Sequence, residues 1–379
     1  MTEPIRILHV LGGVSLGGAE SRIMDLYRCM ERDKVQFDFL VHSTDAKERK
    51  PEFYDEEIKS LGGNIYVLPK FKVYNYLSYL KAVKKFFAEH HDFHMVQGHM
   101  TSTASIYLKE AKRAGVLVVA AHARSAGVDK GIKGIITKVL RRPLLKRADY
   151  CFACSTEAGR AVFGKNWENS PKAKVIPNAI DVAKFKYNRE VREGVRREEE
   201  LENCYVIGHV GRFHYAKNHE FLLEVFAFVH EKMNKIGMNA VLMLLGEGPG
   251  MEAVKEQART LGIEKDVLFM GNKKEIEKYY QAMDYFVFPS RFEGLPGTVV
   301  EAQAAGLRCL ISDRVTGEVA LSELVHYESI DKKPDLWAEY ILEHASYERR
   351  SMENTVKEAG FDVKNQAEDM KRFYMGEQM

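Results

Sequence analysis

The chain has 379 residues, of which 45% are hydrophobic and 29% are charged. This length exceeds one ordinary domain and suits two domains that each bury a core, and the composition excludes a disordered chain. The apolar run 5–11 is too short for a signal peptide or a membrane span, and no run of 18 apolar residues occurs. We therefore expect a cytoplasmic protein that meets membranes only peripherally.

The net charge of +2 is unevenly distributed. Residues 1–180 carry 29 Lys and Arg against 19 Asp and Glu, whereas residues 181–379 carry 27 against 35. This asymmetry indicates two domains with different partners, the first facing something anionic. A nucleic-acid partner is not expected.

In the first half, predicted strands and helices alternate. The strands are continuous apolar runs, typical of buried parallel strands, and the helices repeat apolar residues at helical spacing. Strands are expected at 5–11, 35–41, 64–68, 95–97, 116–121 and 149–155, and helices at 19–30, 53–61, 74–88 and 103–114. This order favours a doubly wound parallel sheet.

The pattern restarts after a boundary at 175–181, where Pro177 breaks a strand. A charged helix at 189–202 follows, with strands at 205–210, 240–245, 267–270, 285–288 and 308–311. The sequence therefore predicts an α/β protein with two Rossmann-like domains, 1–180 and 181–361, that bind ligand at the carboxyl ends of their strands. A helix over about 362–379 is expected to pack back on the first domain.

Five cysteines include the pair Cys151 and Cys154. A zinc site would need two further ligands at comparable spacing, and none follow. Because the pair falls in a short apolar strand, core packing is favoured over redox or metal chemistry. The odd count fits a reducing compartment.

A glycine-rich loop, 11–20, follows the first strand. Its glycines, Gly13 among them, allow close backbone approach to a ligand, and the next helix presents free N–H groups to an anion. A dinucleotide site would place a carboxylate near the end of the second strand, but that strand ends at residues 40–43 without one. NAD binding is therefore disfavoured, while a tight turn without ligand stays an alternative.

A second motif, Gly211-Arg212 followed by Lys217, leaves another strand. An arginine can donate two parallel hydrogen bonds to phosphate oxygens, and a lysine supplies a point charge. Both would project at the carboxyl end of the strand. The alternative is a pair of solvated surface cations.

The third motif, 288–306, places Glu293 before a helix that Pro296 is suited to start, near Gly297. Glu301 would lie about 6 Å further along the helix axis. Two carboxylates thus bracket a helix N-terminus that can hold an anion. Because carboxylates bind hydroxyls and repel phosphate, the simplest ligand is a nucleotide sugar.

These motifs resemble those of glycosyltransferase family 4, a retaining family with the GT-B fold. Glu293 and Glu301 match its E-x7-E motif, and Gly211 to Lys217 match its G-R-x4-K motif. Residues 176–181 resemble the interdomain signature, with Ala179 where glycine is usual, and residues 245–249 also match. Bacterial capsular and exopolysaccharide glycosyltransferases are the most similar type.

The resemblance implies roles for these residues. Arg212 and Lys217 would neutralise the donor diphosphate, Glu293 would contact sugar hydroxyls, and Glu301 would bind the ribose. The loops at Gly211, Gly13 and Gly294-Leu295-Pro296 would complete the phosphate cradle, although Pro296 has no N–H. The base would lie near Gly246, Glu247 and Asn272.

Two histidines of the first half are further candidates. His122, after the strand expected at 116–121, resembles the family histidine near the sugar. His99, after the strand at 95–97, is a second candidate for acceptor or sugar contact, with a purely structural histidine as the alternative.

The implied reaction is retaining transfer of a sugar from a nucleotide diphosphate, preferably UDP, to a glycan or lipid-linked acceptor. No metal or other cofactor is expected, since the chain has no D-x-D triplet. The alternatives are a sugar-nucleotide epimerase of the same fold and a non-catalytic nucleotide-sugar-binding module.

Residues 130–147 contain seven basic residues and no acidic one. Five apolar residues fall on one helical face of this segment: Ile132, Ile135, Ile136, Val139 and Leu140. A basic amphipathic helix of this kind can lie on an anionic membrane surface. The alternative is that its apolar face packs on its own domain.

Overall fold

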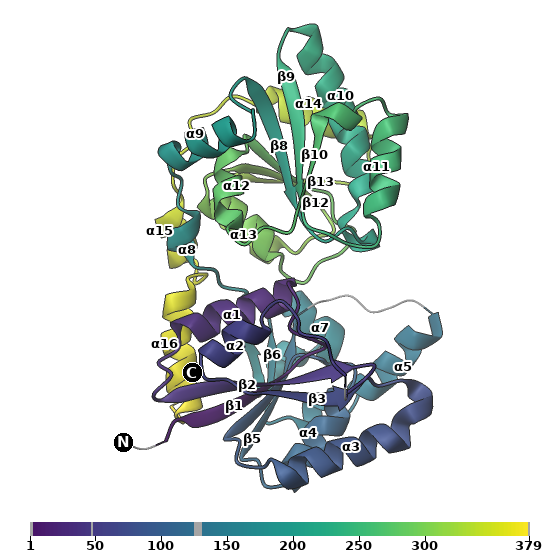
Figure 1. Cartoon of the computed structure of the whole chain (residues 1–379), viewed down its shortest axis with the longest axis vertical. Coiled ribbons are helices and arrows are strands. Elements are labelled where there is room, and N and C mark those ends of the chain that lie inside the picture. Colours follow the sequence, from purple (N-terminus) through teal and green to yellow (C-terminus); the bar gives the residue numbers. More distant parts are fainter. Residues whose placement is uncertain (1–2, 47, 125–130, 378–379) are drawn as a thin grey trace. The chain divides into compact units, whose positions relative to one another are not determined.

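The computed structural model describes residues 3–46, 48–124 and 131–377, except for the side chains of 131–133. The chain forms two compact units (Figure 1). Unit 1 comprises Met1–Asn178 and Val363–Met379, and unit 2 comprises Ala179–Asp362. None of the described helices is long and apolar enough to cross a membrane.

Unit 1 is built on a parallel sheet of seven described strands in the order β3-β2-β1-β4-β5-β6-β7. The strands are β1 (Ile5–Val10), β2 (Val35–Ser43), β3 (Ile65–Pro69), β4 (Met95–Gly98), β5 (Val118–Ala123), β6 (Tyr150–Ala153) and β7 (Ala173–Val175). The sequence order turns back between β1 and β4. Because the connections leave these two strands toward opposite faces, their carboxyl ends border a crevice where open α/β sheets bind ligands.

Helices cover both faces of this sheet (Figure 1). They are α1 (Gly18–Cys29), α2 (Asp55–Ser60), α3 (Tyr76–Glu89), α4 (Ala104–Arg113), α5 (Gly131–Arg141), α6 (Leu144–Arg147), α7 (Thr156–Phe163) and α16 (Val363–Tyr374), with short 3₁₀ turns η1 (Val73–Asn75) and η2 (Trp167–Asn169). Although α16 comes from the end of the chain, it packs on α1. Lys371 of α16 pairs with Glu31, and the Tyr374 hydroxyl donates to Gln97 Oε1 in β4 at 2.8 Å.

Unit 2 is built on a parallel sheet of six described strands in the order β10-β9-β8-β11-β12-β13. They are β8 (Cys204–Val210), β9 (Asn239–Leu245), β10 (Val267–Gly271), β11 (Tyr285–Phe288), β12 (Arg308–Ser312) and β13 (Val325–Glu328). Here the order turns back between β8 and β11. Their carboxyl ends therefore border the equivalent ligand-binding crevice.

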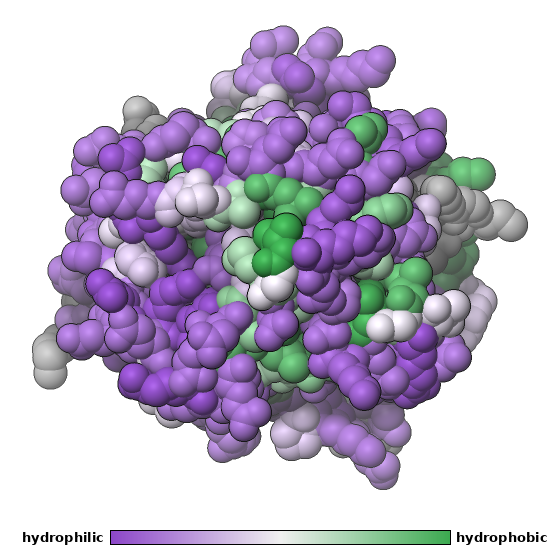
Figure 2. Space-filling view, turned by 90° about the horizontal axis from the view of Figure 1, so that it is seen from above, coloured by the Kyte–Doolittle hydropathy of each residue, from purple (hydrophilic) through white to green (hydrophobic). Residues whose placement is uncertain are grey.

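The helices of unit 2 are α8 (Val182–Phe185), α9 (Arg189–Glu198), α10 (His219–Lys235), α11 (Met251–Thr260), α12 (Ile276–Ala282), α13 (Gly297–Ala304), α14 (Pro334–Glu343) and α15 (Glu353–Glu358). Three 3₁₀ turns, η3 (Tyr215–Lys217), η4 (Glu264–Asp266) and η5 (Gly317–Val319), connect them to the strands. Side chains of α10, α14 and the central strands form a continuous core that includes Trp337 and Phe226. Seen from the end where α10 ends and β9 begins, the surface is mostly hydrophilic with several scattered hydrophobic groups (Figure 2).

The doubly wound parallel sheets confirm the predicted α/β architecture, but several strand boundaries differ by up to two residues, and the difference at β5 bears on the site. The sequence placed a strand at 116–121, whereas β5 runs from Val118 to Ala123. Gly115 has a φ of +97° and ends α4, and the Val116 N–H still bonds back to Ala111 O at 3.2 Å. The strand therefore begins two residues later, and it also ends two residues later, which places His122 inside it.

Candidate active site

Three neighbouring strands of unit 2 are joined at their carboxyl ends by the loops that follow them. The Gly211 N–H donates to Leu245 O at 2.9 Å, and the Gly246 N–H donates to Gly271 O at 2.9 Å. These bonds hold the loops after β8, β9 and β10 side by side. Two predicted site residues, Gly211 and Gly246, thus lie at one edge of the sheet.

Gly246 has no tolerance for a side chain. Its φ is +129°, and a Cβ at this position would lie 2.3 Å from Gly211 O. A residue other than glycine would separate the two loops. Beside them, Asn272 Nδ2 donates to Glu247 Oε2 at 3.1 Å, so the residues expected near the base contact each other.

The loops after β8 and β11 are tied together by an ion pair. Lys217 Nζ lies 2.7 Å from Glu293 Oε1, with both side chains less than one-fifth exposed. The Lys217 ammonium also lies 4.5 Å from the centre of the Phe288 ring. Asn218 adds a second link through Nδ2 to Pro289 O at 3.1 Å. Two residues that the sequence assigned to different parts of the donor are therefore direct neighbours.

Arg212 differs from Lys217 in its surroundings. It is exposed, and no ion pair joins it to another described residue. The crevice between β8 and β11 consequently holds one cation paired with a carboxylate and another that is available to an incoming anion. An uncompensated guanidinium at this edge suits a diphosphate.

Helix α13 begins at Gly297 directly after Pro296, as the sequence predicted. The loop residues Gly294 and Leu295 lead into it. In its first turn the Thr298 hydroxyl is buried and has no hydrogen-bond partner among the described residues. Free N–H groups, the helix dipole and this hydroxyl together favour a bound anion at the helix N-terminus.

Glu301 lies further along α13 and is only 4% exposed. Tyr280 of α12 donates a hydrogen bond from its hydroxyl to Glu301 Oε2 at 2.7 Å. This bond orients the carboxylate, and no motif in the sequence pointed to Tyr280. Tyr280 lies on the preceding helix, and its contact with Glu301 depends on how α12 packs on α13. No fixed spacing in the sequence therefore links the two residues.

Two buried histidines lie beneath the β8 loop. His209 Nδ1 contacts Val287 O at 2.8 Å, and His219 stacks on Phe213 with ring centres 4.2 Å apart. Burial lowers the pKa of His219 to about 3, and burial lowers the pKa of His209 well below its usual range. Both rings are neutral at pH 7, so the positive charge of this edge comes from Arg212 and Lys217.

In unit 1, Gly13 lies in the loop between β1 and α1. The N–H of the next residue, Val14, donates to Glu52 Oε2. A Cβ on Gly13 would meet the same carboxylate at 2.7 Å. The Glu52 carboxylate therefore lies against the loop at Gly13 and accepts a hydrogen bond from the residue after it.

The sequence placed His122 directly after a strand expected at 116–121. Instead His122 is fully buried within β5, and its Nδ1 lies 2.9 Å from Gln97 Nε2. The strand ends two residues later than expected, and His122 Nε2 has no hydrogen-bond partner among the described residues. His99 follows β4 and is also mostly buried, with its Nε2 3.0 Å from His9 Nδ1.

No group of three or more His, Cys, Asp or Glu side chains in the described ranges is arranged to hold a metal ion. Cys151 and Cys154 are fully buried in unit 1 and form no disulfide. Burial raises the pKa of the Cys151 thiol to about 12, so this group stays protonated at neutral pH. Both cysteines belong to the core.

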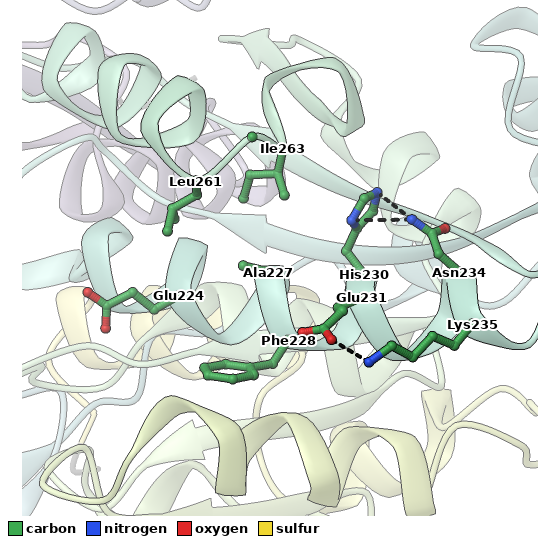
Figure 3. Close-up of a pocket in the computed structure, with 10 residues that line it drawn as sticks. Glu224, Ala227, Phe228, His230, Glu231, Asn234, Lys235, Leu261 and Ile263 are labelled. Atoms are coloured by element: carbon green, nitrogen blue, oxygen red, sulfur yellow. Dashed lines mark hydrogen bonds and ion pairs between the residues drawn. The ribbon is translucent and has the colours of Figure 1, made fainter.

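A surface hollow of about 670 Å³ lies elsewhere in unit 2, between α10 and the turn after α11 (Figure 3). Its polar side chains already contact one another: His230 lies 3.1 Å from Asn234, and Glu231 pairs with Lys235. Because α10 runs from the end of β8 toward the start of β9, this part of it lies near the amino ends of the strands. Ligands of such sheets bind at the opposite edge, and none of the predicted site residues lines the hollow.

Comparison with known proteins identifies the family of the chain. The family described as Glycosyltransferase Family 4 matches residues 16–184, and the family described as Glycosyl transferases group 1 matches residues 204–344. EpsF of Bacillus subtilis (strain 168), assigned as a glycosyltransferase, is 36% identical over 366 residues, which cover 94% of this chain and 93% of EpsF. The chain belongs to the family 4 glycosyltransferases.

Other relatives of this glycosyltransferase are more distant. The capsular polysaccharide biosynthesis glycosyltransferase CapH of Staphylococcus aureus is 24% identical over 98% of this chain and 99% of CapH. An Escherichia coli galactosyltransferase that transfers from UDP-Gal to α-D-GlcNAc-diphosphoundecaprenol is 32% identical over 38% of this chain and 37% of that enzyme. The crystal structure of Anabaena HepE in complex with UDP superposes with a TM-score of 0.75 at 17% identity, covering 99% of this chain and all of HepE. The GT-B fold and a glycosyltransferase of polysaccharide biosynthesis follow from these matches.

Proposed function

We propose that this glycosyltransferase moves a sugar from a UDP-sugar to a lipid-linked glycan acceptor, with retention of the anomeric configuration. The observation that carries the donor site is the contact between Lys217 and Glu293 beside the N-terminus of α13. A cation for phosphate and a carboxylate for hydroxyls meet there at the carboxyl ends of β8 and β11. A sugar diphosphate presents those two kinds of group next to each other.

The charges of the site suit a departing diphosphate. Lys217 has three N–H donors, so it can keep its bond to Glu293 while it donates to a phosphate oxygen. Arg212 adds a second cation with no competing ion pair among the described residues. As the bond from the sugar to the diphosphate breaks, negative charge grows on the leaving oxygen, and these fixed cations stabilise it.

The remaining steps follow the family resemblance. The acceptor hydroxyl forms the new bond to the anomeric carbon on the face that the diphosphate leaves, and its proton passes to the departing diphosphate. Glu293 positions the sugar and Glu301 positions the ribose. No side chain is assigned as a nucleophile.

UDP and a lipid-linked acceptor are supported by relatives rather than by this chain alone. HepE was crystallised with UDP, and the Escherichia coli relative uses UDP-Gal and a diphosphoundecaprenol acceptor. The Escherichia coli relative matches little more than one third of this chain. Its acceptor therefore supports a class of substrate, an anionic lipid carrier, and no particular sugar.

We further propose that unit 1 docks on an anionic membrane at the inner face of the cell membrane. In α5, the apolar side chains of Ile135 and Val139 are 64% and 50% exposed, so they do not pack fully on their own unit. The basic side chains of Lys138 and Arg142 are exposed beside them. Lys130 lies outside the described residues, as do the side chains of Ile132 and Lys133. An exposed face that alternates apolar and basic groups suits a lipid interface.

A second segment of unit 1 has the same character. Residues 65–88 carry five lysines and no acidic residue. Where η1 leads into α3, the side chains of Tyr74 and Leu77 are 84% and 79% exposed. Both α3 and α5 pack against α4 in unit 1 (Figure 1). Exposed aromatic and aliphatic groups among lysines are typical of side chains that insert at a membrane interface.

Vesicle flotation tests the docking. The wild type should float with anionic phosphatidylglycerol vesicles and not with neutral phosphatidylcholine vesicles. We expect the protein to be released from the vesicles when serine replaces Lys138, Arg141, Arg142 and Lys146. We expect the same when serine replaces Tyr74 and Leu77. The matched control replaces four exposed lysines of unit 2 by serine, and this variant should still float. These lysines are Lys232, Lys235, Lys265 and Lys278. Equal flotation of all these proteins would remove the membrane proposal.

A thermal-shift panel of nucleotide sugars, followed by product analysis with the best donor, tests the reaction. We expect UDP-sugars to raise the melting temperature most, and a transferred sugar only when an acceptor is present. An epimer formed from the donor alone would favour the epimerase alternative. Donor binding without any product, across lipid-diphosphate-linked glycans, would favour a non-catalytic binding module.

A further inference from the structure

Three side chains of unit 1 meet at the crevice between β1 and β4. His9 is the penultimate residue of β1, and His99 directly follows β4; their rings stack with centres 5.3 Å apart. Arg124 directly follows β5, and its Nε lies 3.4 Å from His99 Nδ1. The Arg124 guanidinium is therefore held at the edge of the sheet where ligands bind.

The hydrogen bonds fix where the protons of these rings lie. Because Arg124 Nε can only donate, His99 Nδ1 must accept, and its proton is on Nε2. That proton points to His9 Nδ1 at 3.0 Å, which leaves the His9 proton on Nε2. Burial lowers the pKa of His9 to about 3 and the pKa of His99 well below its usual range, so both rings are neutral.

Arg124 therefore has no negatively charged hydrogen-bond partner in the described ranges. Its other bond runs from Nη1 to Asn178 Oδ1 at 2.8 Å, which is also a neutral acceptor. Glu20 attracts the guanidinium from a distance and Arg22 repels it. Burial lowers the pKa of Arg124 to about 10, because desolvation disfavours the charged guanidinium.

A site of this kind gains from binding an anion. The guanidinium keeps N–H groups free of described acceptors, and its planar fork matches two phosphate oxygens. The donor diphosphate already has a proposed site in unit 2, with its own cations Arg212 and Lys217. The anion at Arg124 should then belong to the second substrate.

We propose that Arg124 binds a phosphate of the diphosphate through which the acceptor is linked to its lipid. The proposal rests on the proposed function, since it assigns the acceptor side of that reaction. His99 and Asn178 are positioning residues that aim the guanidinium. The substrate class this selects is a lipid diphosphate that carries a sugar, in preference to an uncharged glycolipid or a free glycan.

Calorimetry with geranyl diphosphate as a soluble probe tests this assignment. The titration is made with the full chain saturated with UDP, so that the unit 2 site is filled. Arg124→Gln should weaken probe binding about tenfold or more and leave UDP affinity within about twofold. Arg124→Lys keeps the positive charge but not the planar guanidinium, so it should lose less affinity for geranyl diphosphate than Arg124→Gln. The matched control, Arg113→Gln, removes an exposed cation of the same unit that pairs with Glu110, and should change neither affinity.

Each other outcome overturns the assignment. If Arg124→Gln weakens UDP and spares geranyl diphosphate, Arg124 serves the donor. If neither affinity changes, or the wild type binds no geranyl diphosphate under saturating UDP, Arg124 is not an acceptor phosphate site. Thermal unfolding of each variant verifies that it is folded. If Arg124→Gln is unfolded, the affinity of Arg124→Lys for geranyl diphosphate decides the question instead. Failure of the wild type to bind UDP would instead count against the proposed donor function.

Discussion

Lys217 Nζ and Glu293 Oε1 lie 2.7 Å apart although their residues are 76 positions apart in the sequence. They meet because β8 and β11 are neighbours in the sheet, and each residue lies in the loop that follows one of these strands. The two motifs recognised separately in the sequence are thus parts of one site. The cation proposed to bind phosphate is thus paired with the carboxylate proposed to bind the sugar.

We expect Arg212→Ala and Lys217→Ala each to remove most turnover while the fold stays intact. Each deletes a charge-assisted contact to phosphate worth about 1.5–3 kcal/mol, which is about 10- to 100-fold in rate or more. Steady-state transfer rates measure the effect. Lys255→Ala, in the same unit and paired with Glu252, is the matched control. Normal turnover in both test variants would contradict the phosphate assignment.

We expect Glu293→Gln to lower turnover more than UDP affinity. The variant keeps the size of the side chain but loses the charge that accepts sugar hydroxyls and holds Lys217. UDP has no donor sugar, so it does not need this carboxylate. Rates and UDP calorimetry on the same preparation separate the two effects, and a larger loss in UDP affinity than in rate would refute the assigned role.

Glu301→Ala should weaken UDP binding itself, and Tyr280→Phe should weaken it less. The Tyr280 hydroxyl donates to Glu301 at 2.7 Å, so its loss frees the carboxylate to rotate without removing it. A buried hydrogen bond to a charged group suggests about a tenfold loss for Tyr280→Phe. UDP affinity equal to that of the wild type in Glu301→Ala would exclude the ribose role.

Acid should destabilise unit 1 through His9. Burial lowers the pKa of His9 to about 3, so the folded protein does not take up this proton where the unfolded chain does. The contribution of His9 to the free energy of unfolding is therefore fully present above pH 6.5. It is lost as the pH falls below 6.5, and the loss reaches about 2 kcal/mol at pH 5. In His9→Gln, the loss of unfolding free energy between pH 7 and pH 5 should be smaller by that amount.

The control for this pH effect is His91→Gln, which replaces an exposed histidine of the same unit. It should keep the pH dependence of the wild type. If His9→Gln and the wild type lose the same free energy between pH 7 and pH 5, His9 is not the buried neutral group that the hydrogen bonds indicate.

We expect turnover without a divalent metal ion. Arg212, Lys217 and the N-terminus of α13 supply the positive field that a metal would otherwise provide to the diphosphate. Transfer rates with a chelator should match those with added magnesium or manganese. Complete loss of activity in chelator that either ion restores would show that the protein cations are not sufficient.

The sequence predicts most of the fold because its strands are apolar runs bounded by glycines. Strand β11 begins and ends where the pattern placed it, and α13 begins at Gly297 as expected. Strand β13 was missed, since its residues Val325–Glu328 alternate with polar groups and are only partly buried. Short edge strands carry too little of the apolar signal to be recognised.

The candidate donor site follows from sequence motifs, whereas its supporting residues do not. Glu293 and Glu301 are recognised by their spacing along one segment. Tyr280 reaches Glu301 only through the packing of α12 on α13, which no local pattern encodes. The predicted strand stops two residues before the end of β5, so the sequence analysis did not single out Arg124, which directly follows the strand.

Nuclear magnetic resonance of the transferred sugar tests the central claim most directly. The enzyme is supplied with a UDP-α-sugar and a lipid-diphosphate-linked glycan, and the anomeric proton of the transferred sugar is observed in the product. The proposed reaction gives an α-linked product together with one UDP for each sugar transferred. A β-linked product, or an epimerised donor with no transfer, would contradict it.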